Sequence, residues 1–259
     1  HLVWELTESS AKSFLLMAVE DYALDESDAD QRLRLDQIVD GVIKEKQREP
    51  LRELANDSEL LRKEVALVKE NGAAVGLILR LAEMLEQPER VAFLETGSMF
   101  HPNDYWLHLE RATAYLEQPV PEIDLAADAY LAVLAINPDS AVVWCNRGCL
   151  LNKNENPSQA IYCFRRAISL NPEVRHAHAN LAGLLHGQGD LEAALEAALV
   201  AVEIDPNDPL AHLHLGRILN AQEDSEGAIE HVRRASELCK EHPLIEQAMQ
   251  ELGQTQDSN

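Results

Sequence analysis

The chain has 259 residues, of which 46% are hydrophobic, and a formal net charge of −23. The apolar fraction is sufficient for a packed core and excludes wholesale disorder. The acidity argues against nucleic acid and against an anionic membrane surface as partners, because both present negative phosphates. No apolar run approaches the roughly 18 residues of a membrane helix. Four cysteines without a CxxC pair favour free thiols and a cytoplasmic location.

Residues 1–70 are predicted to form an irregular helical segment. Apolar residues recur at helical spacing over Ser9–Leu24, Ser27–Lys46 and Ser58–Lys69, and no stretch alternates like a strand. Two arrangements stay open, a small bundle packed on the following region or further helical hairpins. Because the sequence begins at His1 rather than Met, we expect it to be a piece of a longer protein.

Internal repeats follow. Residues 141–174, 175–208 and 209–242 align without gaps at a spacing of 34, which is typical of repeat architectures. Each segment has a small residue at position 8 and Ala at positions 20 and 27, in a pattern that also calls for large residues at positions 4, 11 and 24 and Pro at position 32. The first segment supplies Trp144, Gly148, Leu151, Ala160, Phe164, Ala167 and Pro172. The third departs from the pattern with Lys240 at the proline position, and Pro243 follows it.

Two weaker repeats precede these, and a cap follows them. Residues 105–140 form a repeat that is two residues too long, with the excess at 118–121, where a turn is expected. Residues 71–104 form a degenerate repeat that has Arg90 and Gly97 at the two alanine positions. The array therefore spans 71–242. Residues 243–259 are predicted to be a capping helix over Pro243–Leu252 and a frayed polar tail.

The pattern resembles the tetratricopeptide repeat (TPR). This resemblance implies an all-α fold in which each repeat is a pair of antiparallel helices and the repeats stack into a right-handed superhelix, an α-solenoid. The physical reason for stacking is that one hairpin cannot bury its own apolar face. The resemblance also implies a non-catalytic scaffold that binds a protein or peptide partner.

A second resemblance is narrower. The string HPNDYWLH at 101–108 resembles an element that opens the C-terminal repeats of planctomycete-type bacterial serine/threonine protein kinases. It implies that the chain is a regulatory or substrate-docking tail of such a kinase. The sequence itself contains no GxGxxG, HRD or DFG motif, so we predict that this chain is not an enzyme and needs no cofactor.

The TPR resemblance also implies which residues bind. The first helix of each repeat lines the concave groove of such an array, and positions 2, 5, 6, 9, 12 and 13 point into it. The predicted peptide-binding groove consists of Leu109, Thr113, Val142, Cys145, Asn146, Cys149, Asn152, Lys153, His176, Asn180, Gly183, His186, Leu213, His214, Arg217 and Asn220.

Two asparagines suggest how the groove would bind. Asn146 and Asn180 occupy the same position in consecutive repeats, and an amide can pair with any peptide backbone because it both donates and accepts hydrogen bonds. This resembles the asparagine ladder of superhelical TPR proteins. Shallow apolar contacts are expected at Leu109, Val142 and Leu213. The net charge predicts a ligand that is not strongly acidic.

Two other kinds of site, a clamp for a terminal carboxylate and a metal site, are less compatible with the residues. The positions that clamp a terminal carboxylate in chaperone adaptors here hold Cys145, Cys149, Asn180, Leu210 and His214, and they lack the cations that such a clamp needs. The histidine pairs at 176 and 178 and at 212 and 214 have a spacing unsuited to a metal site, so we predict no bound metal. Self-association of the array remains an alternative to partner binding.

Overall fold

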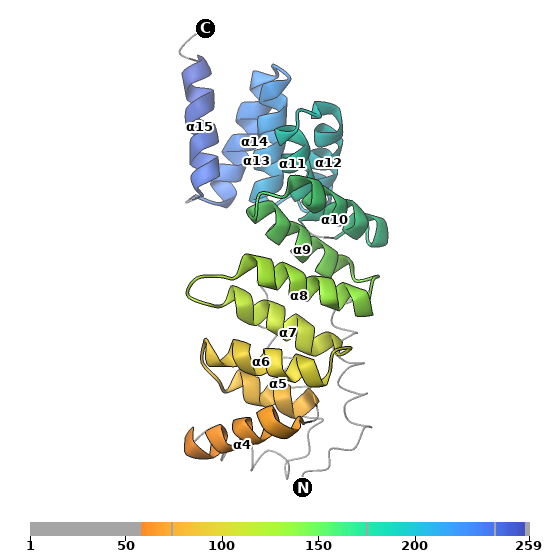
Figure 1. Ribbon diagram of the computed structural model, residues 1–259. Helices are drawn as coiled ribbons and strands as arrows, with labels where there is room; N and C mark the ends of the chain where they lie inside the picture. The colour runs from red at the N-terminus through yellow and green to blue at the C-terminus, as the bar shows by residue number, and fades with distance from the viewer. Residues whose placement is uncertain (1–57, 74, 175, 241, 257–259) are drawn as a thin grey trace. The chain divides into compact units, whose positions relative to one another are not determined.

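The computed structural model describes residues 58–73, 75–174, 176–240 and 242–256 (Figure 1). These residues contain twelve helices and no strand, which confirms the predicted all-α fold for this part of the chain. The chain divides into an N-terminal unit, His1–Pro138, and a C-terminal unit, Asp139–Asn259. The helices expected over Ser9–Leu24 and Ser27–Lys46 lie outside the described residues.

The N-terminal unit consists of helices packed on their neighbours in sequence. Helix α5 packs on α6, α6 on α7 and α7 on α8, while α4 contacts α5 and α6. The helix predicted over Ser58–Lys69 is α4. The bounds are Ser58–Asn71 for α4, Val75–Glu83 for α5, Glu89–Phe100 for α6, Tyr105–Leu116 for α7 and Ile123–Ile136 for α8.

The two substitutions at alanine positions of the degenerate repeat have separate structural roles. Gly97 on α6 lies where a Cβ atom would be 2.8 Å from the Ile78 side chain, so glycine keeps α5 and α6 close. Arg90 instead reaches α7, where it forms ion pairs with Glu110 and with Glu117, the latter at 2.8 Å. Ion pairs thus connect α6 to α7 at the position where the repeat pattern has a buried alanine.

The C-terminal unit consists of three helical hairpins and a final helix. Each predicted segment of 34 residues contains one hairpin: α9 packs on α10, α11 on α12 and α13 on α14. Helix α15 covers α13 and α14, and it continues to Gln256, four residues beyond the predicted end of the cap. The bounds are Ala141–Lys153 for α9, Pro157–Leu170 for α10, Ala177–Gly187 for α11, Leu191–Ile204 for α12, Pro209–Ala221 for α13, Ser225–Leu238 for α14 and Pro243–Gln256 for α15.

Small residues let the paired helices of this unit approach closely. The alanines at positions 20 and 27 of the three repeats are buried: Ala160, Ala167, Ala194, Ala201, Ala228 and Ala235. At position 8, Gly148 faces the Phe164 ring and Gly216 faces Val232. Both partners are completely buried. The small residue on one helix therefore accommodates a large side chain of the other, as the repeat pattern predicts.

The hairpin turns recur with the same backbone geometry. Glu155, Gly189 and Glu223, each 34 residues apart, all have a left-handed φ between 53° and 82°. Glycine adopts this conformation without steric strain, whereas a residue with a Cβ does so at some cost. The helix that follows each turn begins at a side-chain cap, and the caps are Asn156, Asp190 and Asp224. These caps satisfy backbone N–H groups that would lack a partner within the helix.

The glycine contact at α9 and α10 generates a stability prediction. A Cβ atom at Gly148 would lie 2.9 Å from the Phe164 ring, so Gly148→Leu should overpack the crossing and destabilise the protein by about 1–3 kcal/mol. Urea denaturation followed by circular dichroism measures this. Gly187→Ala is the control, because a Cβ there meets no atom within 4 Å. Equal stability of Gly148→Leu and the wild type would contradict the packing described here.

Candidate functional site

The residues predicted to line a groove come from both units. Leu109 and Thr113 lie on α7 of the N-terminal unit, where both are half-buried and the Thr113 hydroxyl donates to the Leu109 carbonyl at 3.3 Å. The other fourteen belong to the C-terminal unit, on α9, α11 and α13 or, for His176, directly before α11. We call the surface formed by these three helices the first-helix face. It is the candidate site.

Most of the predicted residues on this face are accessible. Val142, Asn152, Lys153, His176 and Asn220 are exposed. A second group is half-buried: Asn146, Cys149, Asn180, Gly183, His186, His214 and Arg217. The first-helix face therefore presents a mixture of amide, imidazole and cationic groups.

Two of the predicted contact residues are buried in the core, which corrects their assignment to the groove. Leu213 is fully buried because α15 covers this part of α13 and places Ile245 and Ala248 against it. Cys145 is also buried, and packs within the cluster that contains Phe164 and Leu181. Position 5 of these repeats therefore points inward, and neither side chain can contact a partner from this location.

Asn180 is held in place by two hydrogen bonds on the face. Its amide Nδ2 donates to the His176 carbonyl at 2.8 Å and contacts the Cys149 sulfur at 3.7 Å. Both N–H groups are thus directed within the protein. The Oδ1 atom is the part of this amide that can accept a hydrogen bond from a bound peptide.

The neighbouring thiols of α9 differ in their ionisation. A hydrogen bond with Cys149, together with burial, raises the pKa of Cys145. The same hydrogen bond lowers the pKa of Cys149; burial opposes this effect, while the positive fields of His176 and Lys153 reinforce it. Cys149 is therefore the thiol of this pair that ionises more readily.

A pocket at the end of the face brings three predicted residues together. His186 of α11 and Arg217 and Asn220 of α13 line a cavity of about 280 Å³. Val232 of α14 and three residues of α15, Ala248, Glu251 and Leu252, complete its lining with Gly216 and Ala221. The sequence pattern did not assign α15 to the site. A helix at the end of the array follows the last repeat directly, and this is the signal that could have placed it there.

Arg217 is the source of the positive field around this pocket. Burial is the largest of the effects that lower the pKa of His214 to about 4; Arg217, His186 and His242 act in the same direction, while Asp208 opposes the shift. Burial and Arg217 also lower the pKa of His186. His214 is consequently neutral at neutral pH. Gly183 makes room for its ring, since a Cβ atom there would lie 2.5 Å from the imidazole.

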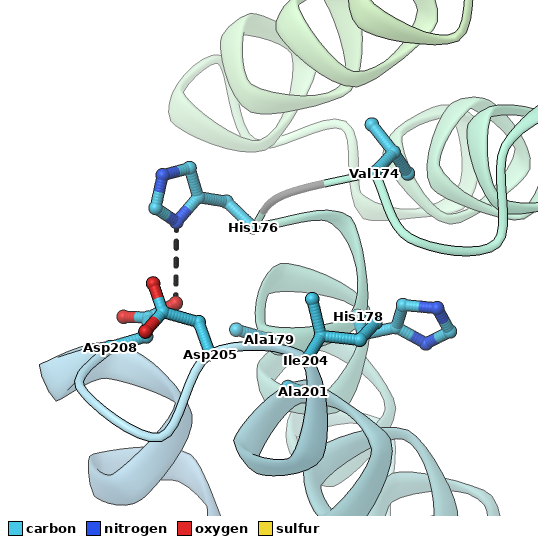
Figure 2. A pocket seen from close by; sticks show the side chains of 8 residues that line it. All are labelled: Val174, His176, His178, Ala179, Ala201, Ile204, Asp205 and Asp208. Carbon is cyan, nitrogen blue, oxygen red and sulfur yellow. Dashed lines mark hydrogen bonds and ion pairs between the residues drawn. The ribbon is translucent and has the colours of Figure 1, made fainter. Parts of the chain in front are cut away.

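His176 and Asp208 connect the beginnings of α11 and α13. Figure 2 shows the two side chains facing each other, with the His176 Nδ1 atom 3.2 Å from a carboxylate oxygen of Asp208, and both residues line a small cavity. Asp208 also caps α13 by accepting from the Leu210 N–H at 2.8 Å. Burial raises the pKa of Asp208, but the hydrogen bonds from His176 and the backbone outweigh it, and the pKa is lowered. The cavity, about 10 Å³, has room for no ligand larger than water.

The histidines at position 4 of the repeats have a structural role that the sequence pattern did not reveal. His108, His178 and His212 each hydrogen-bond through Nε2 to the carbonyl of the proline six residues earlier, at 2.8–3.0 Å. Each ring thus provides a hydrogen-bond partner for a backbone carbonyl in the turn that precedes its helix. Among the described residues, no group of three or more His, Cys, Asp or Glu side chains could hold a metal ion.

Comparisons with known proteins support the TPR resemblance. Residues 145–209 match the family model for the tetratricopeptide repeat, so this segment of the C-terminal unit has TPR sequence. No curated protein matches the chain significantly.

Solved structures of TPR proteins share the fold. The structure of YrrB, described as a TPR protein with an unusual peptide-binding site, has 22% identity and a TM-score of 0.58 over 71% of this chain and 96% of its own. MamA residues 41 to the end, from Desulfovibrio magneticus RS-1, have 21% identity and a TM-score of 0.53 over 71% and 96%. Another MamA structure has 16% identity and a TM-score of 0.52 over 69% and 91%. The chain therefore has the fold of a TPR solenoid.

Within the described part of the chain, each helix is too short or too polar to cross a lipid bilayer.

The depressed pKa of His214 predicts a specific pH dependence of stability. Between its ordinary value of 6.5 and about 4, the unfolded chain binds a proton that the folded chain does not, so stability falls as the pH drops through this window. His214→Gln should reduce this fall by about 1–3 kcal/mol, since one pKa unit corresponds to about 1.4 kcal/mol.

Urea denaturation at pH 7 and pH 4.5 measures the difference. His178→Gln is the matched control, because it removes a half-buried imidazole of α11 whose Nε2 atom bonds to the Pro172 carbonyl. A reduction of the pH dependence by His178→Gln as large as that by His214→Gln would contradict the assignment.

Proposed function

We propose that the chain is a protein-interaction scaffold whose first-helix face binds an extended segment of a protein partner. The observation that carries this proposal is the pocket of about 280 Å³, in which Arg217, His186 and Asn220 come together at the surface. This volume lies just below the range usual for small-molecule sites. It suits one or two side chains of a peptide better than a cofactor.

The asparagines supply the part of the site that would contact a peptide backbone. Asn146 and Asn180 lie one repeat apart on α9 and α11 and are both half-buried. Because the Asn180 N–H groups are directed to His176 and Cys149, its Oδ1 would accept a backbone N–H of the ligand. Such a contact is independent of the ligand's side chains, so the pocket would supply the specificity.

The fold relatives are compatible with this proposal. TPR arrays present an extended surface built from successive repeats, and the structure of YrrB is described as containing a peptide-binding site. The pocket of this chain is built in part from its own final helix, α15. We therefore place the partner's side chains at the α13–α15 end of the first-helix face.

Two other functions inferred from the sequence stay predictions. The string at 101–108, which resembles the kinase element, has structural roles in the N-terminal unit: Asp104 caps α7 by accepting from the Leu107 N–H at 2.9 Å, and His108 binds the Pro102 carbonyl. The coding sequence before His1 tests the kinase-tail function. Light scattering over a range of concentrations tests self-association.

Replacing Asn146 and Asn180 together by alanine should weaken peptide binding. The probe is an array of random ten-residue peptides with amidated C-termini, incubated with the full chain carrying a fluorescent label. We expect the double variant to bind the array peptides at least roughly fivefold more weakly, since each hydrogen bond contributes about 0.5–1.5 kcal/mol, while its helical circular dichroism is unchanged.

The matched control removes an amide from the second helix of the same repeat. Gln159→Ala lies on α10 at an exposed position and should bind as the wild type does. Absence of binding by the wild type to any array peptide would refute the proposed function. Unchanged binding by the folded double variant would refute the role of the asparagines.

A further inference from the structure

The charges of the C-terminal unit are sorted between its first and second helices. Helices α9, α11 and α13 contain no Asp or Glu. By contrast, α12 and α14 each contain three glutamates, and α10 contains no acid but two arginines. In a chain with a net charge of −23, the helices of the first-helix face therefore contribute no carboxylate of their own.

The cations of the first helices are not equally available. Arg147 donates to the Cys163 sulfur at 3.4 Å and is thus turned toward α10. Lys153 is exposed at the end of α9, and Arg217 is half-buried in the pocket wall. On the second helix α14, Arg234 and Arg233 pair with Glu237 at 3.4 and 3.9 Å.

The surroundings of Arg217 suit an anion next to an apolar group. The guanidinium is a planar fork of donors that binds carboxylates with two hydrogen bonds, and the Asn220 amide and the His186 ring lie in the same lining. Val232, Ala248 and Leu252 supply an apolar wall. Glu251 also lines the pocket, and its charge would oppose an incoming anion. Arg217 carries the opposite charge in the same lining.

We propose that the first-helix face selects an acidic, extended segment of a protein partner, with an Asp or Glu side chain of that segment bound at Arg217 and a neighbouring apolar side chain in the same pocket. This inference rests on the proposed function. It differs from the expectation drawn from the net charge of the whole chain, because α9, α11 and α13 contain no Asp or Glu, whereas α12 and α14 each contain three glutamates. It also differs from a chaperone-type clamp, since Arg217 and Asn220 occupy other positions of the repeat.

The peptide array described above tests the inference. The peptides bound by the wild-type chain should be enriched in Asp and Glu relative to the whole array. A matched peptide in which the preferred Glu is replaced by Gln should bind roughly tenfold more weakly, the factor that corresponds to 1.4 kcal/mol. Amidation removes the terminal carboxylate, so the preference is assigned to side chains. Raising the salt concentration should reduce it.

Arg217→Glu should abolish the preference for acidic peptides and favour Lys and Arg. Arg233→Glu makes the same change in net charge on the exposed surface of α14, and it should keep the wild-type preference. Arg217→Gln supplies the same test with a smaller perturbation if the circular dichroism of Arg217→Glu shows unfolding.

The outcomes separate this inference from the proposed function. Binding of peptides without enrichment in Asp and Glu would refute the inference and leave the scaffold function intact. An equal effect of Arg217→Glu and Arg233→Glu would also refute it, because net charge alone would then explain the preference. No binding of any peptide would refute both. A preference lost in the variants of Arg217 and retained in Arg233→Glu supports it.

Discussion

The close approach of paired helices is the constraint on which the structure of the C-terminal unit depends. A hairpin of two short helices has little stability alone, because one hairpin buries only part of its apolar surface. Gly148 against Phe164 and Gly216 against Val232 bring the helices near enough for the alanines behind them to be fully covered. Of the first helices, α11 and α13 pack against each other. The pocket around Arg217 exists because α13 is held between α11, α14 and α15.

The charged residues of this unit are distributed unevenly between its helices. The outer surface carries the glutamates of α12 and α14, which keep a chain of this charge well hydrated. The first helices carry amides, imidazoles and two accessible cations. Where Arg217 approaches His186 and His214, burial and the positive field lower the pKa of both imidazoles. A strong net charge therefore says little about the local field at a binding surface, which is set by the groups within about one Debye length.

The histidines have different surroundings at different positions of the repeat. At position 4, His108, His178 and His212 satisfy proline carbonyls and stabilise the turns. His212 has an additional contact, a stacked arrangement with His231 whose ring centroids are 5.2 Å apart. At positions on the first-helix face, His186 lines the pocket instead. A count of histidines alone would suggest a metal site, but their separate hydrogen-bond partners show why they do not converge.

The sequence by itself determined the helical hairpins and their register. Small and large residues at fixed positions of a 34-residue period impose the same local packing in each repeat, so the buried alanines and the role of Gly148 could be read from the pattern. The Arg90 link from α6 to α7 could not be predicted, because an ion pair across helices leaves no periodic signal.

Only the tertiary structure decided which residues of the face are accessible. Leu213 and Cys145 have positions that the family pattern assigns to the groove, but the covering helix α15 buries the first and the core cluster buries the second. The pocket likewise required α15, whose residues are far along the chain from His186. Burial depends on what packs against a residue from elsewhere in the chain, and a local pattern carries no information about that neighbour.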